Sequence, residues 1–207
     1  MEYDAAVAAY EEGDSETALR KLLQLAEQEH SGAQYSLGIF YEKGEDSIRD
    51  FAEAAKWYRK ATDQGSYRAQ NNLANMYEHG RGVPQDHAEA ERLYLKSAEQ
   101  GNAKAQYNLG QLYMGDLDNP DFFKVAHKWF RMAAEQGYSP AQSCLGVIYL
   151  GGYGVPEDYV QAYMWLSLAV AQEDWTATMN LDNLVKRMTP AQIDEGQQLA
   201  REWELDQ

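Results

Sequence analysis

A 36-residue period is the sequence feature that most constrains the fold of this chain. The dipeptide Ala-Gln occurs at Ala33, Ala69, Ala105 and Ala141, and each copy lies 36 residues after the one before. A Leu, a small residue and a Tyr follow each copy at a helical spacing, so they form one apolar stripe on a helix. A period of this length predicts a stack of helical repeats.

A second apolar stripe follows the first in every repeat, after a loop. In the first repeat it consists of Ala54, Trp57, Tyr58 and Ala61, and residues of similar type recur at the same spacing in the other three. This pattern predicts a second helix that packs against the first. Gly65 then stands where a residue with positive φ would end the helix. We expect the recurring Trp and Gln positions to be structural.

The loops inside two repeats contain the sequence Gly-Val-Pro, followed two residues later by Asp86 or Asp158. Proline ends a helix, and aspartate is a favoured N-cap, so these residues predict where the second helices begin. At the other end of the chain, Thr189, Pro190 and Gln192 have the pattern of an N-cap, a first-turn proline and a capping glutamine. They predict a last helix.

At these positions the sequence resembles the Sel1-like repeat (SLR) family, a branch of the tetratricopeptide repeats. Three motifs carry the resemblance: AQxxLGxxYxxG from Ala33, Ala105 and, with Gly146, Ala141; GVPxD at Val83 and Val155; and AxxWxxxAAEQG from Ala126 to Gly137. The resemblance covers nearly the whole chain. It implies tetratricopeptide-like helix pairs, with the first helix of each pair lining the concave face of a right-handed superhelix. The last helix is similar to that of bacterial members.

We therefore predict an all-α fold, a right-handed superhelical solenoid of antiparallel helix pairs with about twelve helices. It would form a single domain over residues 1–207. We expect a divergent N-terminal helix pair, four regular repeats and a divergent C-terminal capping pair, in this order: 1–30, 31–65, 66–101, 102–137, 138–173 and 174–207.

The charge of the chain bears on its partners. It has 18 Lys and Arg residues against 33 Asp and Glu residues, a formal net charge of −15. Such a chain repels phosphate groups, so nucleic acid and anionic membranes are poor candidate partners. The single cysteine, Cys144, cannot form an intrachain disulfide. We expect a monomer without cofactor or metal.

The sequence also bears on localisation. It has no apolar run long enough for a membrane-spanning helix and no signal-peptide pattern at its start. We expect a soluble protein, cytoplasmic as written, or periplasmic or exported if a signal peptide was removed.

Positions beside the packing stripe of the first helices vary from repeat to repeat. We therefore expect that packing does not dictate them and that they are candidates for binding a partner. If the first helices line a groove, these residues would face it: Tyr35, Ile39, Glu42, Asn71, Asn75, Glu78, Tyr107, Gln111, Met114, Ser143, Val147 and Leu150. A groove of this kind suits an extended peptide or a helix. The alternative is that these side chains are only the solvated sides of helices.

Candidates for catalysis are few. The four histidines are scattered, and no pair on one helix face has a third ligand at metal spacing. Cys144 lacks a local nucleophile motif, so we expect an inert thiol. Some cysteine-rich members of the resembling family were assigned β-lactam hydrolysis, but they have two cysteines in each helix pair. This chain has one, which gives that analogy little support.

Three functions remain to be compared. The first is a non-enzymatic adaptor or scaffold that binds a peptide or helix of a partner protein in the groove. The second is an inhibitor or immunity-type protein that neutralises a dedicated partner. The third, with the least support, is a weak hydrolase. The sequence does not separate an adaptor from an inhibitor, because the two differ only in what the partner loses on binding.

Overall fold

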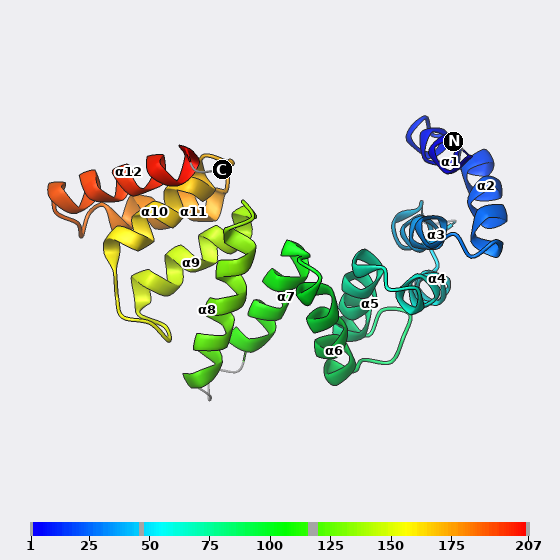
Figure 1. Ribbon diagram of the computed structural model, residues 1–207, viewed down its shortest axis with the longest axis horizontal. Helices are drawn as coiled ribbons and strands as arrows, with labels where there is room; N and C mark the ends of the chain where they lie inside the picture. The colour runs from blue at the N-terminus through cyan, green and yellow to red at the C-terminus, as the bar shows by residue number, and fades with distance from the viewer. Residues whose placement is uncertain (1, 46–47, 116–119, 206–207) are drawn as a thin grey trace. The chain divides into compact units, whose positions relative to one another are not determined.

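The fold consists of α-helices throughout the part of the chain that the computed structural model describes, residues 2–45, 48–115 and 120–205. Figure 1 labels the twelve helices. Their bounds are α1 Glu2–Glu11, α2 Ser15–Glu27, α3 Ser31–Lys43, α4 Phe51–Asp63, α5 Tyr67–His79, α6 His87–Glu99, α7 Ala103–Met114, α8 Pro120–Ala134, α9 Ser139–Gly151, α10 Tyr159–Val170, α11 Trp175–Leu184 and α12 Pro190–Leu205. The all-α prediction and the number of helices are confirmed. None of the described helices is long and apolar enough to span a bilayer.

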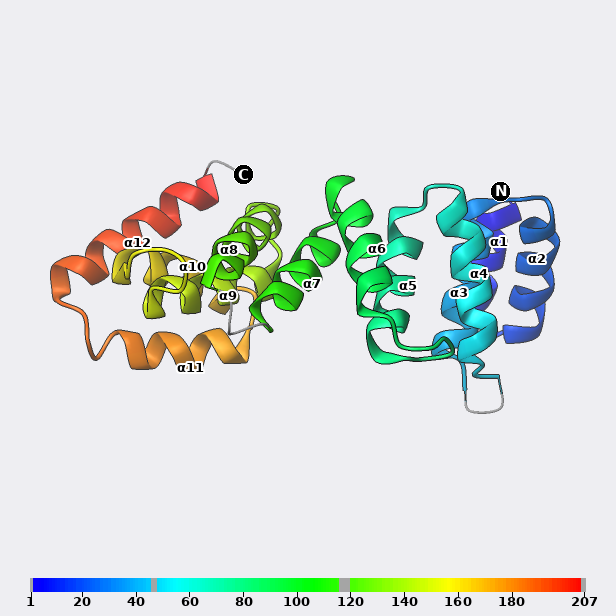
Figure 2. The ribbon, with the colours of Figure 1, turned by 90° about the horizontal axis from the view of Figure 1, so that it is seen from below.

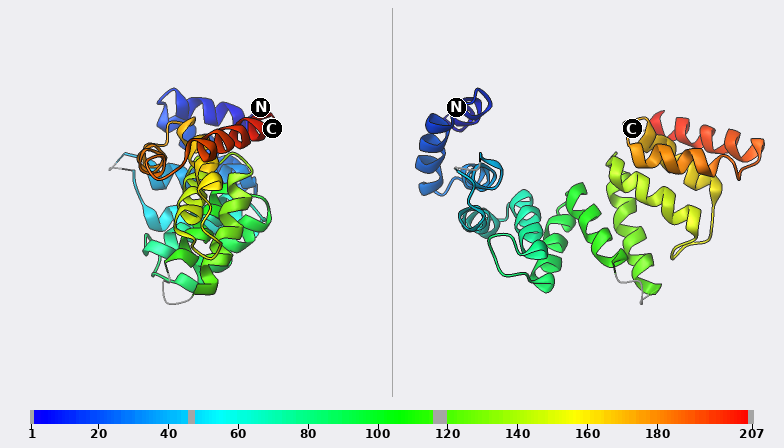
Figure 3. Two further views of the ribbon diagram at one scale, coloured as in Figure 1. Left: turned by 90° about the vertical axis from the view of Figure 1, so that its left-hand side faces the viewer. Right: turned by 180° about the vertical axis from the view of Figure 1, so that it is seen from behind.

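The chain divides into two compact units, Met1–Asn102 with helices α1 to α6 and Ala103–Gln207 with helices α7 to α12. In each unit, consecutive helices pack as pairs: α1 with α2, α3 with α4 and α5 with α6 in the first unit, and α7 with α8 and α9 with α10 in the second. The pairs can be followed from other sides in Figure 3. The right-handed course of the superhelix and the single domain stay predictions.

The helix boundaries follow from local sequence chemistry. Asp86 accepts a hydrogen bond from the Glu89 amide at 3.0 Å, and Asp158 accepts one from the Gln161 amide at 3.0 Å. Both predicted N-caps are confirmed. Thr189 and Gln192 cap the start of α12 reciprocally: the Thr189 amide donates to Gln192 Oε1 at 2.9 Å, and the Gln192 amide donates to Thr189 Oγ1 at 3.3 Å.

The second helices end at a position with positive φ, as the sequence predicts. Gly65, Gly101 and Gly137 have φ values of 85°, 86° and 78° there. Glutamates occupy the equivalent positions just before the first repeat and at the end of the fourth, where Glu29 and Glu173 have φ values of 60° and 64°. The left-handed turn is thus kept even where a non-glycine residue must adopt it, at a cost of about 1 kcal/mol or more.

Close contact between the two helices of a pair depends on a small residue in the first helix. A Cβ atom added to Gly38 would lie 2.3 Å from the Tyr58 ring, and one added to Gly146 would lie 2.4 Å from Leu166. Those distances are far below van der Waals contact, so glycine is required for this approach.

A pair of glutamine side chains links the helices at one end of each repeat. Gln64 donates to Gln34 at 2.7 Å, and Gln172 donates to Gln142 at 2.9 Å. Gln142 in turn donates to the backbone carbonyl of Ala134, at the end of the preceding second helix, at 3.3 Å. The predicted structural role of this glutamine column, the satisfaction of backbone groups between successive repeats, is confirmed.

The tryptophan column is less uniform than the sequence suggests. Trp57 and Trp165 are buried, at 8% and 5% exposure. Trp129 is only half-buried, and the ammonium group of Lys128 lies 5.7 Å from the centre of its ring. Core packing is therefore confirmed for two of the three residues, and Trp129 is a correction, because its side chain is only partly enclosed.

The last two helices do not pair with each other as the complete repeats do. Helix α10 lies between α11 and α12, and α12 packs mainly against α10 (Figure 2). Trp203 packs edge-on against Trp165 with the ring centres 6.2 Å apart, and Gln197 donates to the Tyr163 hydroxyl at 3.2 Å. The terminal segment thus covers the last complete repeat with both α11 and α12, which pack on α10 and not on each other as a helix pair.

Candidate partner-binding surface

The twelve predicted binding positions lie on the first helices of the four repeats, α3 and α5 in one unit and α7 and α9 in the other. They form three columns, and each column contains one residue from every repeat. The structure gives the three columns different surroundings.

The first column consists of Tyr35, Asn71, Tyr107 and Ser143. Asn71 and Ser143 are buried, with exposures of 3% and 6%. The Tyr35 ring packs 5.9 Å from that of Tyr58, between ring centres. This column therefore faces the second helix of its own repeat. The expectation that Asn71 and Ser143 face a groove is wrong, because the close packing of each helix pair encloses them.

The second column is the most accessible. Its members are Ile39, Asn75, Gln111 and Val147; Gln111 is exposed and the other three are half-buried. Asn75 donates to the Tyr94 hydroxyl at 3.4 Å and accepts a hydrogen bond from Arg81. Ile39 and Val147 add apolar surface to their units. The column thus combines polar and apolar side chains that a partner could reach.

In the third column, the polarity of the first helix matches that of the second. Glu42 accepts a hydrogen bond from the Tyr58 hydroxyl at 2.7 Å. Glu78 accepts one from the Tyr94 hydroxyl, also at 2.7 Å. Both tyrosine residues are completely buried, so each hydroxyl needs a partner.

The remaining repeats have apolar pairs at the same positions, Met114 with Phe130 and Leu150 with Leu166. Burial and the neighbouring glutamate raise the pKa values of Tyr58 and Tyr94 well above the ordinary range. The prediction that packing leaves this column unconstrained is wrong for Glu42 and Glu78.

An apolar hollow of about 180 Å³ opens beside the second column in the first unit. We call it the α1–α3 hollow, and its lining residues are Tyr3, Val7, Tyr10, Leu22, Ser36 and Ile39. The Tyr3 hydroxyl is hydrogen-bonded to Ser36 at 2.8 Å, which joins the two helices at one end of the hollow. The sequence analysis did not find this site, although Tyr3, Val7 and Tyr10 follow a helical spacing that indicates one face.

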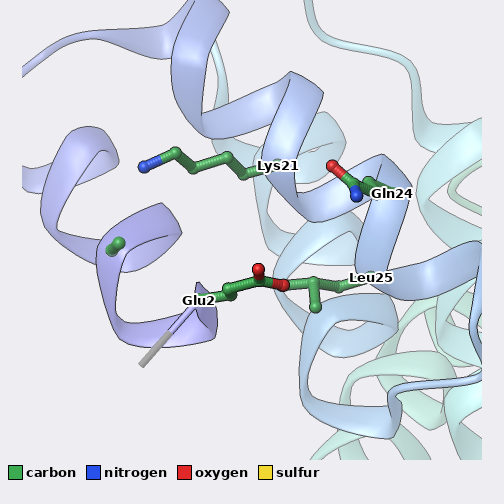
Figure 4. A pocket seen from close by; sticks show the side chains of 5 residues that line it. Glu2, Lys21, Gln24 and Leu25 are labelled. Carbon is green, nitrogen blue, oxygen red and sulfur yellow. The ribbon is translucent and has the colours of Figure 1, made fainter.

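A second hollow, of about 370 Å³, lies at the outer side of α1 and α2. Glu2, Ala5, Lys21, Gln24 and Leu25 line it, and Figure 4 shows the Lys21 side chain extending toward α1, away from the carboxylate of Glu2. Its lining side chains come from α1 and α2 only, and none of the predicted binding positions is among them.

Residues that could support catalysis are dispersed. Among the described residues, no three His, Cys, Asp or Glu side chains are placed to hold a metal ion. Burial raises the pKa of the Cys144 thiol to about 12, so the thiol stays protonated at neutral pH. Burial, with a smaller effect of Arg131, lowers the pKa of His127, whose ring lies 3.1 Å from the Tyr149 hydroxyl.

The comparison with protein families agrees with this arrangement of helix pairs. The profile described as Sel1 repeat matches residues 31–66, 68–102, 103–138 and 139–174. The chain belongs to the Sel1 repeat family.

Solved structures of other family members share the fold. A Sel1 repeat protein from Oxalobacter formigenes is 29% identical, with a TM-score of 0.80 over 99% of this chain and 82% of that protein. A protective antigen of uropathogenic Escherichia coli that displays an SLR fold is 32% identical, with a TM-score of 0.55 over 90% of this chain and 48% of the antigen. A search of curated protein sequences finds no significant match.

Proposed function

We propose that this Sel1 repeat protein is a non-enzymatic protein-interaction module, an adaptor or scaffold that binds a peptide or helical segment of a partner protein on the first-helix faces of its repeats. The α1–α3 hollow is the observation that supports this most directly. It is apolar, it includes the predicted binding residue Ile39, and its rim residue Tyr10 is 39% exposed. A hollow of about 180 Å³ can accept one apolar side chain, and aromatic residues at such a site are typical interface anchors.

The second unit supports the same proposal through different residues. Val147 on α9 is a half-buried apolar side chain, and Met114 and Leu150 add the exposed parts of side chains that otherwise pack against the core. Exposed apolar surface on a first helix suits an amphipathic segment that brings apolar side chains of its own. Glu42 and Glu78 contribute to the proposal only as the polar edge of the face in the first unit, because each is already hydrogen-bonded to a buried tyrosine.

The test starts with affinity capture and cross-linking to identify a partner, followed by titration of the partner against variants of the full chain. Replacing both Ile39 and Tyr10 with Ala should weaken binding by about 2 kcal/mol or more if they are anchors. Leu95→Ala is the matched control, because Leu95 is also an exposed apolar residue, at 36%, but lies on the second helix α6. Undiminished affinity in the double variant would place the site elsewhere.

The same titration separates an adaptor from an inhibitor. The activity of the partner is measured with and without the saturating chain. An adaptor leaves that activity in place, whereas an immunity-type protein abolishes it at one equivalent.

A further inference from the structure

Helix α1 is held in place by small buried side chains. Its buried residues are Ala6 and Ala9. The first helices of the four repeats each bury a leucine instead, and three of them also bury Phe40, Met76 or Ile148. The free energy of burial grows with the apolar area removed from water, so two methyl groups hold α1 less firmly than these larger side chains hold the other first helices.

Open space lies along two faces of α1. The α1–α3 hollow, of about 180 Å³, borders the face with Val7. The hollow of about 370 Å³ borders the face with Ala5, together with Lys21 and Leu25 of α2 (Figure 4). A close-packed protein interior has few voids larger than a water molecule, so these two hollows indicate that α1 fills its place incompletely.

Tyrosine residues near both ends of α1 connect it to α3. The Tyr3 hydroxyl is hydrogen-bonded to Ser36 at 2.8 Å, and the Tyr3 ring stacks on that of His30 with the ring centres 4.9 Å apart. The ring centre of Tyr10 lies 5.8 Å from that of Phe40. A helix of ten residues is marginal on its own in water, so we expect α1 to unfold when these contacts are lost.

We propose that α1 is a movable wall of the α1–α3 hollow: it leaves α2 and α3 as one unit while the other helices of the first unit stay folded. Tyr3, Val7 and Tyr10 of α1 line the hollow, so the hollow exists only while α1 is docked. A partner side chain in the hollow therefore binds the docked form alone and holds α1 in place. This coupling rests on the proposed function, whereas the movement of α1 does not.

The test measures how fast a cysteine beneath α1 becomes accessible. Leu22 of α2 lines the hollow and is only 2% exposed. It is replaced with Cys in the full chain that also has Cys144→Ser, and the reaction with a maleimide is followed at low reagent concentration. The rate then follows the fraction of molecules in which α1 is open.

Leu166→Cys, also combined with Cys144→Ser, is the matched control. Leu166 is completely buried and occupies the position of α10 that Leu22 occupies in α2, four periods of 36 residues later. Its first helix α9 buries Leu145 and Ile148. We expect Leu22→Cys to react about tenfold or more faster than Leu166→Cys.

Two substitutions in α1 should change the rate at Leu22→Cys in opposite directions. Tyr3→Phe removes the hydroxyl that bonds to Ser36, so the reaction should become about threefold faster or more. Val7→Ile adds apolar volume beside the hollow, so the reaction should become about twofold slower or more. Neither change should affect the rate at Leu166→Cys. Both comparisons use one cysteine, so they hold even if the control cysteine destabilises its own unit.

Equal rates at the two cysteines, or a rate at Leu22→Cys that neither substitution in α1 changes, would overturn the proposal. A urea dependence as steep as that of global unfolding would do the same, because the cysteine would then react only in the unfolded chain. These results would leave the proposed function standing, since the titration of the Ile39 and Tyr10 variant does not require α1 to move. Once a partner is captured, a saturating amount should slow the reaction at Leu22→Cys, and an unchanged rate would refute the coupling.

Discussion

The hydrogen bond between Tyr58 and Glu42 allows a sharp test of how the helix pairs are held together. Tyr58 is completely buried, and its hydroxyl donates to the carboxylate at 2.7 Å. Replacing Glu42 with Met removes the acceptor of this buried O–H group, and its remaining neighbour, the Asn72 amide at 3.0 Å, is itself a donor, so the change should cost about 1–3 kcal/mol. For a chain of this length, each kcal/mol corresponds to a fall in Tm of about 2–4 °C.

The double variant is the informative one. Glu42→Met combined with Tyr58→Phe reproduces the pair that the third repeat already has, Met114 with Phe130. The double variant removes both the donor and the acceptor of this bond, and Asn72, which loses its contact with the Tyr58 hydroxyl, is only half-buried and can bond to water. The double variant should therefore lie within about 1 kcal/mol of the original chain. The single variants should therefore be coupled by about 1–2 kcal/mol.

The assay is urea unfolding followed by circular dichroism at the helical signal for the original chain, both single variants and the double variant. Glu99→Met is the control, because Glu99 is exposed near the end of α6, and the change should stay within about 0.5 kcal/mol. If the two single costs simply add in the double variant, the hydrogen bond does not couple the helices and the reasoning fails.

Four further predictions follow from the same structure. Because the pKa values of Tyr58 and Tyr94 are raised in the folded state, their contribution to stability is present below about pH 10 and is lost as the pH rises further. Replacing both residues with Phe should therefore flatten the fall of Tm between about pH 10 and 12. An unchanged slope would contradict this. Trp165→Ala should cost about 3–5 kcal/mol in urea unfolding, and Trp129→Ala clearly less because its ring is half-buried; equal costs would refute the distinction. Deleting residues 189–207 removes α12 and uncovers the surface of α10 around Trp165, so the truncated chain should associate, and light scattering would detect this. A truncated chain as soluble and as stable as the full one would show that α12 is not a cap. Exhaustive chelation should leave the helical circular dichroism signal unchanged, and a large loss of helix would reveal a metal requirement.

The repeat period was sufficient to predict the helix pairs, because packing demands the same residue type at the same position of every repeat. Asp86 and Asp158 could be predicted as N-caps for a similar reason, since the cap depends only on neighbouring backbone groups. Local chemistry of this kind can be inferred from a single sequence.

The candidate site was harder to predict, because variation between repeats has two causes. Glu42 and Glu78 differ from Met114 and Leu150, and we interpreted that difference as freedom from packing. The structure shows that these residues vary together with the side chain they contact across the pair, for example Glu42 with Tyr58. A comparison of the column of Glu42 with the column of Tyr58 in the sequence would have revealed this. The docking of α12 on α10, in contrast, has no repeating signal in the sequence and depends on tertiary contacts alone.

The glutamine link between helices has an evolutionary consequence. Gln142 bonds on one side to the second helix of its own repeat, through Gln172, and on the other to the end of the preceding one, at Ala134. The same side chain thus accepts a hydrogen bond within its own repeat and donates one to the preceding repeat. Duplication or loss of a whole 36-residue segment therefore creates a junction with the correct chemistry already in place. Proteins of this kind can change length by recombination without inventing a new interface.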